Sequence, residues 1–132
     1  MILVDTTVWI DYFRGKGTAQ TEWLDRSLGV TRVAICDLIL CELLQGTASD
    51  AEFAEVLAKM SACDLLSTGG RDLAVAAARN YRYLRQHGHT VRKTVDCMIA
   101  TLCLLQGHRL LHNDRDFEPF ETVLGLEVVH PS

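Results

Sequence analysis

Residues 110–117, Leu110-Leu-His-Asn-Asp-Arg-Asp-Phe117, begin like a buried strand and end in side chains of both charge signs. Asp114 and Asp116 follow the apolar pair closely. A turn or helix cap readily explains one acid in this place, because Asp and Asn favour both. Two acids at the end of a core strand raise the question of whether other acids in the chain lie in similar places.

Apolar strands alternate with helices outward from this segment. Strands are expected at residues 2–4, 32–35, 64–66, 110–112 and 127–129. Helices are expected from Thr6 or Thr7 to about 13, at 20–28, at 38–45, from Ser49 or Asp50 to about 62, at 71–86 and at 94–106, with a short helical piece at 116–124. The expected caps include Thr6 or Thr7, Asp37 and Thr94. This alternation predicts an α/β fold in which helices cover both faces of a parallel sheet.

The composition is that of an ordinary globular protein: 48% of the 132 residues are hydrophobic and 23% are charged. We find no internal repeat and no linker, so residues 1–132 are expected to form one domain. No apolar run of eighteen residues occurs, and the first residues do not resemble a signal peptide. We therefore expect a cytoplasmic protein without a membrane contact.

The five cysteines are odd in number and show no C-x-x-C spacing. We interpret them as small reduced core residues, and a structural zinc site is the less favoured alternative.

Four acids lie in or beside apolar segments that should form the core. Asp5 and Asp114 each follow a strand, and ligands in open parallel sheets bind outside the carboxyl ends of the strands. Glu42 interrupts an apolar helix, and Asp96 begins a helix that is apolar almost all round. Each acid alone has a structural alternative: a helix cap or turn for Asp5 and Asp114, a partly exposed helix edge for Glu42, and a favourable helix-dipole position for Asp96.

One shared site explains the four acids better than four separate caps. Converging carboxylates repel one another unless a cation holds them, so without metal at least one should titrate abnormally high. Oxygen ligands favour hard ions such as Mg²⁺ or Mn²⁺ over zinc. Such a site suits phosphodiester hydrolysis. Asp116 is either an accessory ligand or the N-cap of the following helix.

Basic residues are concentrated in one segment although the net charge is −4. No acid occurs from Leu73 to Val95. That window contains five of the thirteen Lys and Arg residues: Arg79, Arg82, Arg85, Arg92 and Lys93. Arg92 and Lys93 precede Asp96 closely and are expected to contact phosphate, whereas the other three fit either an RNA-binding stripe or a solvated helix face.

Four segments together resemble the signature segments of PIN-domain ribonucleases, in particular VapC toxins of toxin–antitoxin pairs. They are DTTVWIDYF (5–13), LILCELLQG (38–46), TVRKTVDCMIATLCLLQG (90–107) and LLHNDRDF (110–117). The resemblance implies a three-layer α/β/α sandwich with about five parallel strands and a Mg²⁺- or Mn²⁺-dependent endoribonuclease. It further implies a homodimer and a VapB-type antitoxin that obstructs the site.

The resemblance also assigns roles to individual residues. Asp5, Glu42, Asp96 and Asp114 match the family's acids, with Asp5 and Asp96 as the most direct metal ligands. Thr7 matches a supporting Ser or Thr, and Asp116 an acid present in only some relatives.

Two other classes of function compete with this interpretation. Phosphotransferases of the haloacid-dehalogenase type need a second Asp two residues after the first, where this chain has Thr7. A catalytically silent PIN-like module that binds RNA or an antitoxin without cleavage remains the alternative.

Overall fold

Short apolar runs form the sheet of this protein, whose structure, a computed structural model, describes residues 1–132. The strands are β1 (Ile2–Val4), β2 (Val33–Cys36), β3 (Asp64–Leu66) and β4 (Arg109–Leu111). They are parallel and lie in the order β3-β2-β1-β4. Every residue of β1 and β2 is buried, as expected when helices cover both faces of a parallel sheet.

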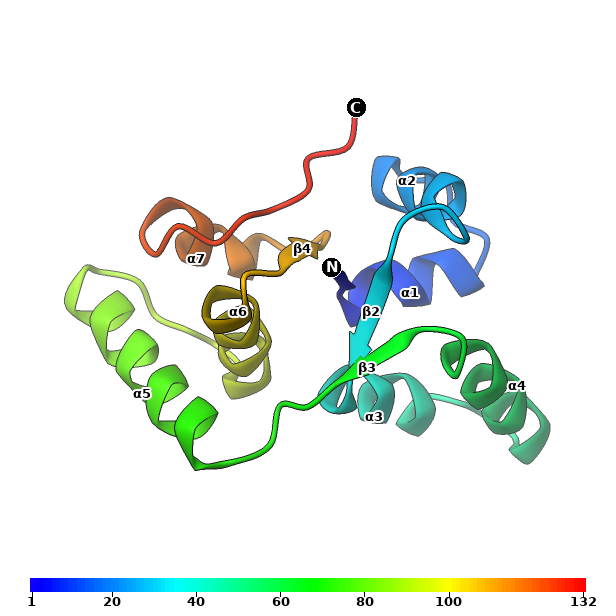
Figure 1. The fold of residues 1–132 in the computed structure, drawn as a ribbon, viewed down its shortest axis with the longest axis horizontal. Helices are drawn as coiled ribbons and strands as arrows, with labels where there is room; N and C mark the ends of the chain where they lie inside the picture. Colours follow the sequence, from blue (N-terminus) through cyan, green and yellow to red (C-terminus); the bar gives the residue numbers. More distant parts are fainter.

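Seven α-helices and one 3₁₀ turn connect the strands. They are α1 (Thr6–Phe13), α2 (Ala19–Ser27), α3 (Asp37–Gln45), α4 (Asp50–Met60), α5 (Arg71–Gln86), α6 (Thr94–Gln106), η1 (Arg115–Phe117) and α7 (Glu118–Thr122). Helices α5 and α6 lie on one side of the sheet, and α1, α2 and α4 lie on the other (Figure 1). The predicted α/β/α sandwich is confirmed. No helix has the length and apolarity needed to cross a bilayer.

Helix α6 forms the centre of its layer. It is buried from Ile99 to Cys103, packs against α5 and β4, and ends at Gly107, whose φ of 71° favours glycine. A buried Ile or Leu in such a helix contributes about 1.5–3 kcal/mol relative to an exposed one. Packing therefore holds the start of α6, with Asp96, rigidly against the carboxyl ends of the strands.

The predicted fifth strand at residues 127–129 reduces to one isolated parallel bridge between Leu110 and Val128. The backbone N–H of Leu110 donates to Glu127 at 2.9 Å, and that of Val129 donates to Leu110 at 2.9 Å. Pro131 follows two residues later and has no N–H with which to continue the ladder. The sheet accordingly has four strands rather than about five.

Three predicted helix caps are wrong by one or two residues. Asp5, not Thr6 or Thr7, caps α1. Asp37 and Thr94 are the first residues of α3 and α6 and not their caps. The Asp37 side chain instead accepts hydrogen bonds from the Leu38 N–H and from the N–H and hydroxyl of Thr68, and so ties the end of β2 to the segment after β3.

All five cysteines are free, but they do not all lie in the core. Cys36, Cys97 and Cys103 are buried, Cys63 is half-buried, and Cys41 is exposed. The core prediction is wrong for Cys41, since α3 buries only one face, through Ile39 and Leu43.

Candidate metal centre

The carboxyl ends of the neighbouring strands β1 and β4 place acids side by side. Val4 pairs with Leu111, so β1 and β4 end at the same level. Asp5 follows directly, and its backbone N–H donates to the Leu111 carbonyl at 2.9 Å. Asp114 lies three residues beyond β4. The register therefore places Asp5 and Asp114 at the same edge of the sheet, as predicted.

Asp5 is a buried carboxylate with a local support. It is 3% exposed, and its Oδ2 accepts hydrogen bonds from the Thr7 hydroxyl at 2.8 Å and from the Thr7 N–H at 3.3 Å. Burial raises the pKa of Asp5, the hydrogen bonds from Thr7 oppose that shift, and the charge of Glu42 adds to it. Thr7 therefore holds Asp5 in place, which is the supporting position expected of it.

Asp96 is the most perturbed of the candidate acids. It lies in the first turn of α6, is 8% exposed, and its Oδ2 is buried without a hydrogen-bond partner. Burial is the main cause that raises the pKa of Asp96 to about 7, and the charges of Asp5, Asp114 and Glu42 raise it further, while Lys93 lowers it. Loss of hydration therefore contributes more to the raised pKa of Asp96 than repulsion between the acids does.

The turn after β4 brings two further carboxylates to Asp96. Asp114 caps η1, and its Oδ1 accepts the N–H of Asp116 at 2.9 Å. One ligand oxygen from each of Asp96, Asp114 and Asp116 lies within 4.8 Å of the other two. Asp116 lies inside η1, so the alternative that it caps the following helix is wrong. Its side chain is free to join the acidic cluster, which we define as Asp96, Asp114 and Asp116.

Glu42 approaches this cluster from α3 through a contact that the sequence did not indicate. Its Oε1 accepts a hydrogen bond of 3.0 Å from the hydroxyl of the buried Thr6. Thr6 is thus a polar residue of the site that was expected only as a possible helix cap. Glu42 and Asp5 are outside the cluster of three, but their charges raise the pKa of Asp96.

The oxygen-only donor set fits a hard divalent cation. A buried ionised carboxylate is costly unless it is paired or bound to a metal, and Asp96 Oδ2 has neither a donor nor a salt bridge. Three carboxylates at this spacing, without His or Cys among them, resemble the ligands of Mg²⁺ or Mn²⁺ rather than those of zinc. The residues present therefore fit such an ion.

The predicted basic residues are all exposed and form no ion pair with an acid. Lys93 immediately precedes α6, and its effect on the pKa of Asp96 places it near the cluster. Arg79, Arg82 and Arg85 lie on α5, where the guanidinium of Arg85 lies 5.8 Å from the centre of the Tyr81 ring. Their charges remain available for an anionic partner.

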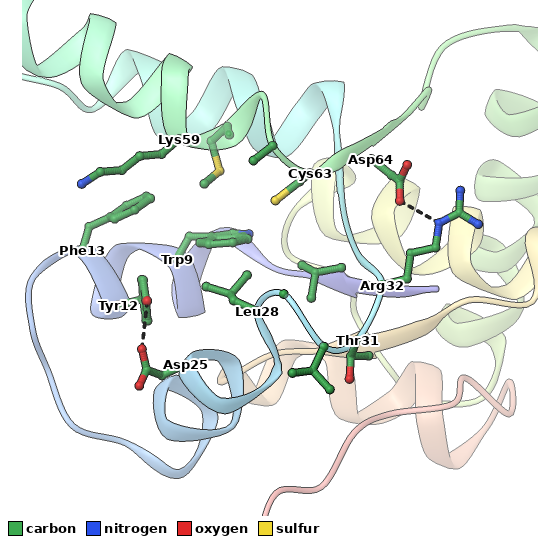
Figure 2. A pocket seen from close by; sticks show the side chains of 15 residues that line it. Trp9, Tyr12, Phe13, Asp25, Leu28, Thr31, Arg32, Lys59, Cys63 and Asp64 are labelled. Carbon is green, nitrogen blue, oxygen red and sulfur yellow. Dashed lines mark hydrogen bonds and ion pairs between the residues drawn. The ribbon is translucent and has the colours of Figure 1, made fainter.

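A cavity of about 1140 Å³ lies away from these acids. Figure 2 shows Trp9, Tyr12 and Phe13 of α1 facing Leu28 and Cys63 across it. Its other lining residues come from α2, from the end of α4 and from the segments that lead into β2 and β3, at the amino ends of these strands. Neither Asp96 nor Asp114 lines this cavity, so it does not contribute to the metal centre.

Comparison with known proteins identifies the family. A family model for the PIN domain matches residues 2–121. The chain is also 33% identical over 129 residues to ribonuclease VapC11 of Mycobacterium tuberculosis and to VapC ribonuclease Mb1587 of Mycobacterium bovis, with 96% of each chain covered. The chain is a VapC-type member of the PIN-domain family.

Solved structures confirm the PIN fold at lower sequence identity. VapBC2 from Rickettsia felis, bound to a promoter DNA fragment, matches with a TM-score of 0.77 and 16% identity over 98% of both chains. DNA-bound VapBC from Salmonella typhimurium matches with a TM-score of 0.76 and 23% identity, over 97% of this chain and 96% of that chain.

Proposed function

We propose that this VapC-type protein is a divalent-metal-dependent endoribonuclease, the toxin of a toxin–antitoxin pair. The observation that carries the proposal is the buried Asp96, whose free oxygen lies beside Asp114 and Asp116 at the open edge of the sheet. The identity to VapC11, named a ribonuclease, selects RNA as the substrate among possible phosphodiesters.

In this proposal Asp96, Asp114 and Asp5 are the principal ligands of Mg²⁺ or Mn²⁺. A divalent cation held there supplies positive charge against the phosphate and increases the acidity of water. The Thr7 hydroxyl holds the Asp5 carboxylate, and the Thr6 hydroxyl holds the carboxylate of Glu42. In the same proposal Glu42 is the catalytic carboxylate that accepts a proton from the attacking water or helps to hold the ion, and Asp116 is an accessory ligand.

The exposed cations hold the RNA strand on the same side. Lys93 and Arg92 contact the phosphates nearest the cleaved bond, and Arg85, Arg82 and Arg79 extend the basic surface along α5. Because such contacts neutralise phosphates and release counterions, binding should weaken as salt rises. Cleavage specificity then depends on the shape of the RNA more than on individual base contacts.

The structural neighbours support the proposed partners. Several of them are VapBC complexes, so a cognate VapB-type antitoxin is the proposed inhibitor of this chain. Residues 1–132 act as one domain in this proposal, as a homodimer and in the cytoplasm. The alternative, a silent module that binds RNA or an antitoxin without cleavage, keeps the same fold and acids.

RNA cleavage by the purified chain separates the two functions. We expect strand breaks with Mg²⁺ or Mn²⁺ that EDTA abolishes and that Asp5→Asn abolishes, since Asn keeps the α1 cap but not the charge. Glu127→Gln, a change of an exposed acid outside the acidic cluster, is the matched control and should cleave normally. RNA binding without strand breaks in any metal would establish the silent module instead.

A further inference from the structure

His112 lies between β4 and the turn that carries Asp114 and Asp116. It is not among the proposed metal ligands or RNA-binding residues. Its ring nitrogen Nδ1 is 3.1 Å from the backbone nitrogen of Asp114. A backbone N–H can only donate, so Nδ1 accepts this hydrogen bond and the ring proton resides on Nε2. The imidazole thus accepts a hydrogen bond from the backbone N–H two residues later in the chain, as Asn and Asp side chains do in turns.

The same ring packs against the far end of this turn. Its centroid is 4.9 Å from that of Phe117, the last residue of η1, which is fully buried. Phe117 in turn lies 6.4 Å from Phe120 of α7. His112 therefore contacts the turn at two places, the Asp114 amide and the Phe117 ring, while Asp114 itself holds the N–H of Asp116.

We propose that His112 is a positioning residue that holds Asp114 and Asp116 against Asp96 for a divalent cation. The inference rests on the proposed metal site. Three acids confined within 4.8 Å repel one another when no cation is bound, so the turn needs a restraint that does not depend on the metal. The Nδ1 hydrogen bond is that restraint, because it fixes the backbone from which Asp114 projects.

Two substitutions separate the hydrogen bond from the packing. His112→Phe keeps an aromatic ring beside Phe117, removes the acceptor, and also removes the buried Nε2 hydrogen that has no partner. His112→Asn does the opposite, since its side-chain oxygen can accept the Asp114 N–H while the ring contact is lost. Mn²⁺ binding by calorimetry and metal-free unfolding in urea are measured for both variants and for the wild type.

We expect His112→Phe to bind Mn²⁺ about 10- to 100-fold more weakly, as outer ligand supports typically do when removed. Its metal-free unfolding midpoint should equal or exceed that of the wild type, and high Mn²⁺ should restore most of its RNA cleavage. His112→Asn should keep Mn²⁺ affinity near wild type although it unfolds at lower urea.

A merely structural role predicts the reverse pattern. If Mn²⁺ affinity follows the unfolding midpoint in both variants, or if His112→Phe binds Mn²⁺ as the wild type does, the positioning role is wrong. A wild-type chain that binds no Mn²⁺ would overturn the proposed metal site itself, which is a different result.

Discussion

Replacing Asp96 by Asn should stabilise the metal-free protein, and the gain should depend on pH. Asp96 is buried beside other acids, and its pKa is raised from 3.8 to about 7. The shift is about 7 minus 3.8, roughly 3 pH units, and each unit corresponds to about 1.4 kcal/mol. Ionising Asp96 in the folded protein therefore costs up to about 4 kcal/mol relative to the unfolded chain.

The sign of the pH dependence follows from which state holds the proton. The unfolded chain releases the Asp96 proton near pH 3.8, whereas the folded protein keeps it until about pH 7. Wild-type stability should therefore fall between these values and remain low above them. Asn carries no charge, so the variant lacks this loss. The free energy of unfolding of the variant should exceed that of the wild type by under about 1 kcal/mol at pH 4 and by about 1–3 kcal/mol at pH 8. The value at pH 8 is below about 4 kcal/mol because water that reaches the ionised carboxylate lowers the cost of its charge.

Urea unfolding in EDTA at pH 4 and pH 8 measures this difference. With a slope near 2 kcal/mol per molar, the midpoint at pH 8 should rise by about 1 M in the variant. The control Glu127→Gln removes an exposed charge and should change the free energy of unfolding by less than about 0.5 kcal/mol. With Mg²⁺ added, the wild type should gain stability and Asp96→Asn should gain almost none. Equal or lower stability of the variant at both pH values would refute the view that ionised Asp96 is destabilised by its burial beside other acids.

Two further predictions concern the support of the site and its basic rim. Thr7→Val removes the hydroxyl that donates to Asp5 at 2.8 Å and should lower the free energy of unfolding by about 1–3 kcal/mol. The loss should be greater at pH 8 than at pH 4, because the hydroxyl stabilises the ionised carboxylate of Asp5. Equal losses at both pH values in urea unfolding would contradict this role of Thr7. Lys93→Gln should weaken RNA binding and reduce the slope of log affinity against log salt by about one. The control Lys16→Gln, at an exposed lysine elsewhere, should leave the slope unchanged. If filter binding shows an unchanged slope for Lys93→Gln, Lys93 does not contact a phosphate.

Apolar and periodic segments between turn residues were predictable from the sequence. The strands at 2–4 and 64–66 and the helix at 71–86 have the predicted bounds, because each is an apolar or periodic run between turn residues. The helix predicted after a Thr94 cap ends at Gln106 as predicted and begins at Thr94 itself. The parallel edge that unites Asp5 with Asp114 was also predictable, since alternating strands and helices leave few other arrangements.

Features that depend on one hydrogen bond were not predictable. Asp114 and Asp116 are both good capping residues two positions apart, and only the 2.9 Å bond from the Asp116 N–H decides that Asp114 is the cap. The contact of Thr6 with Glu42 joins residues 36 positions apart, which no local pattern reports. The role of His112 was not predicted because it also depends on a single hydrogen bond, to the N–H of Asp114. Its place two residues before Asp114 is the position from which Asn or Asp side chains close turns.

The position of a bound ion tests the central claim most directly. Crystals grown with Mn²⁺ should show one strong anomalous peak in contact with carboxylate oxygens of Asp96 and Asp114, with Asp5 or Asp116 beside it, and Asp96→Asn should remove that peak. Ordered Mn²⁺ elsewhere on the protein, with these carboxylates free of metal in well-resolved density, would contradict the account.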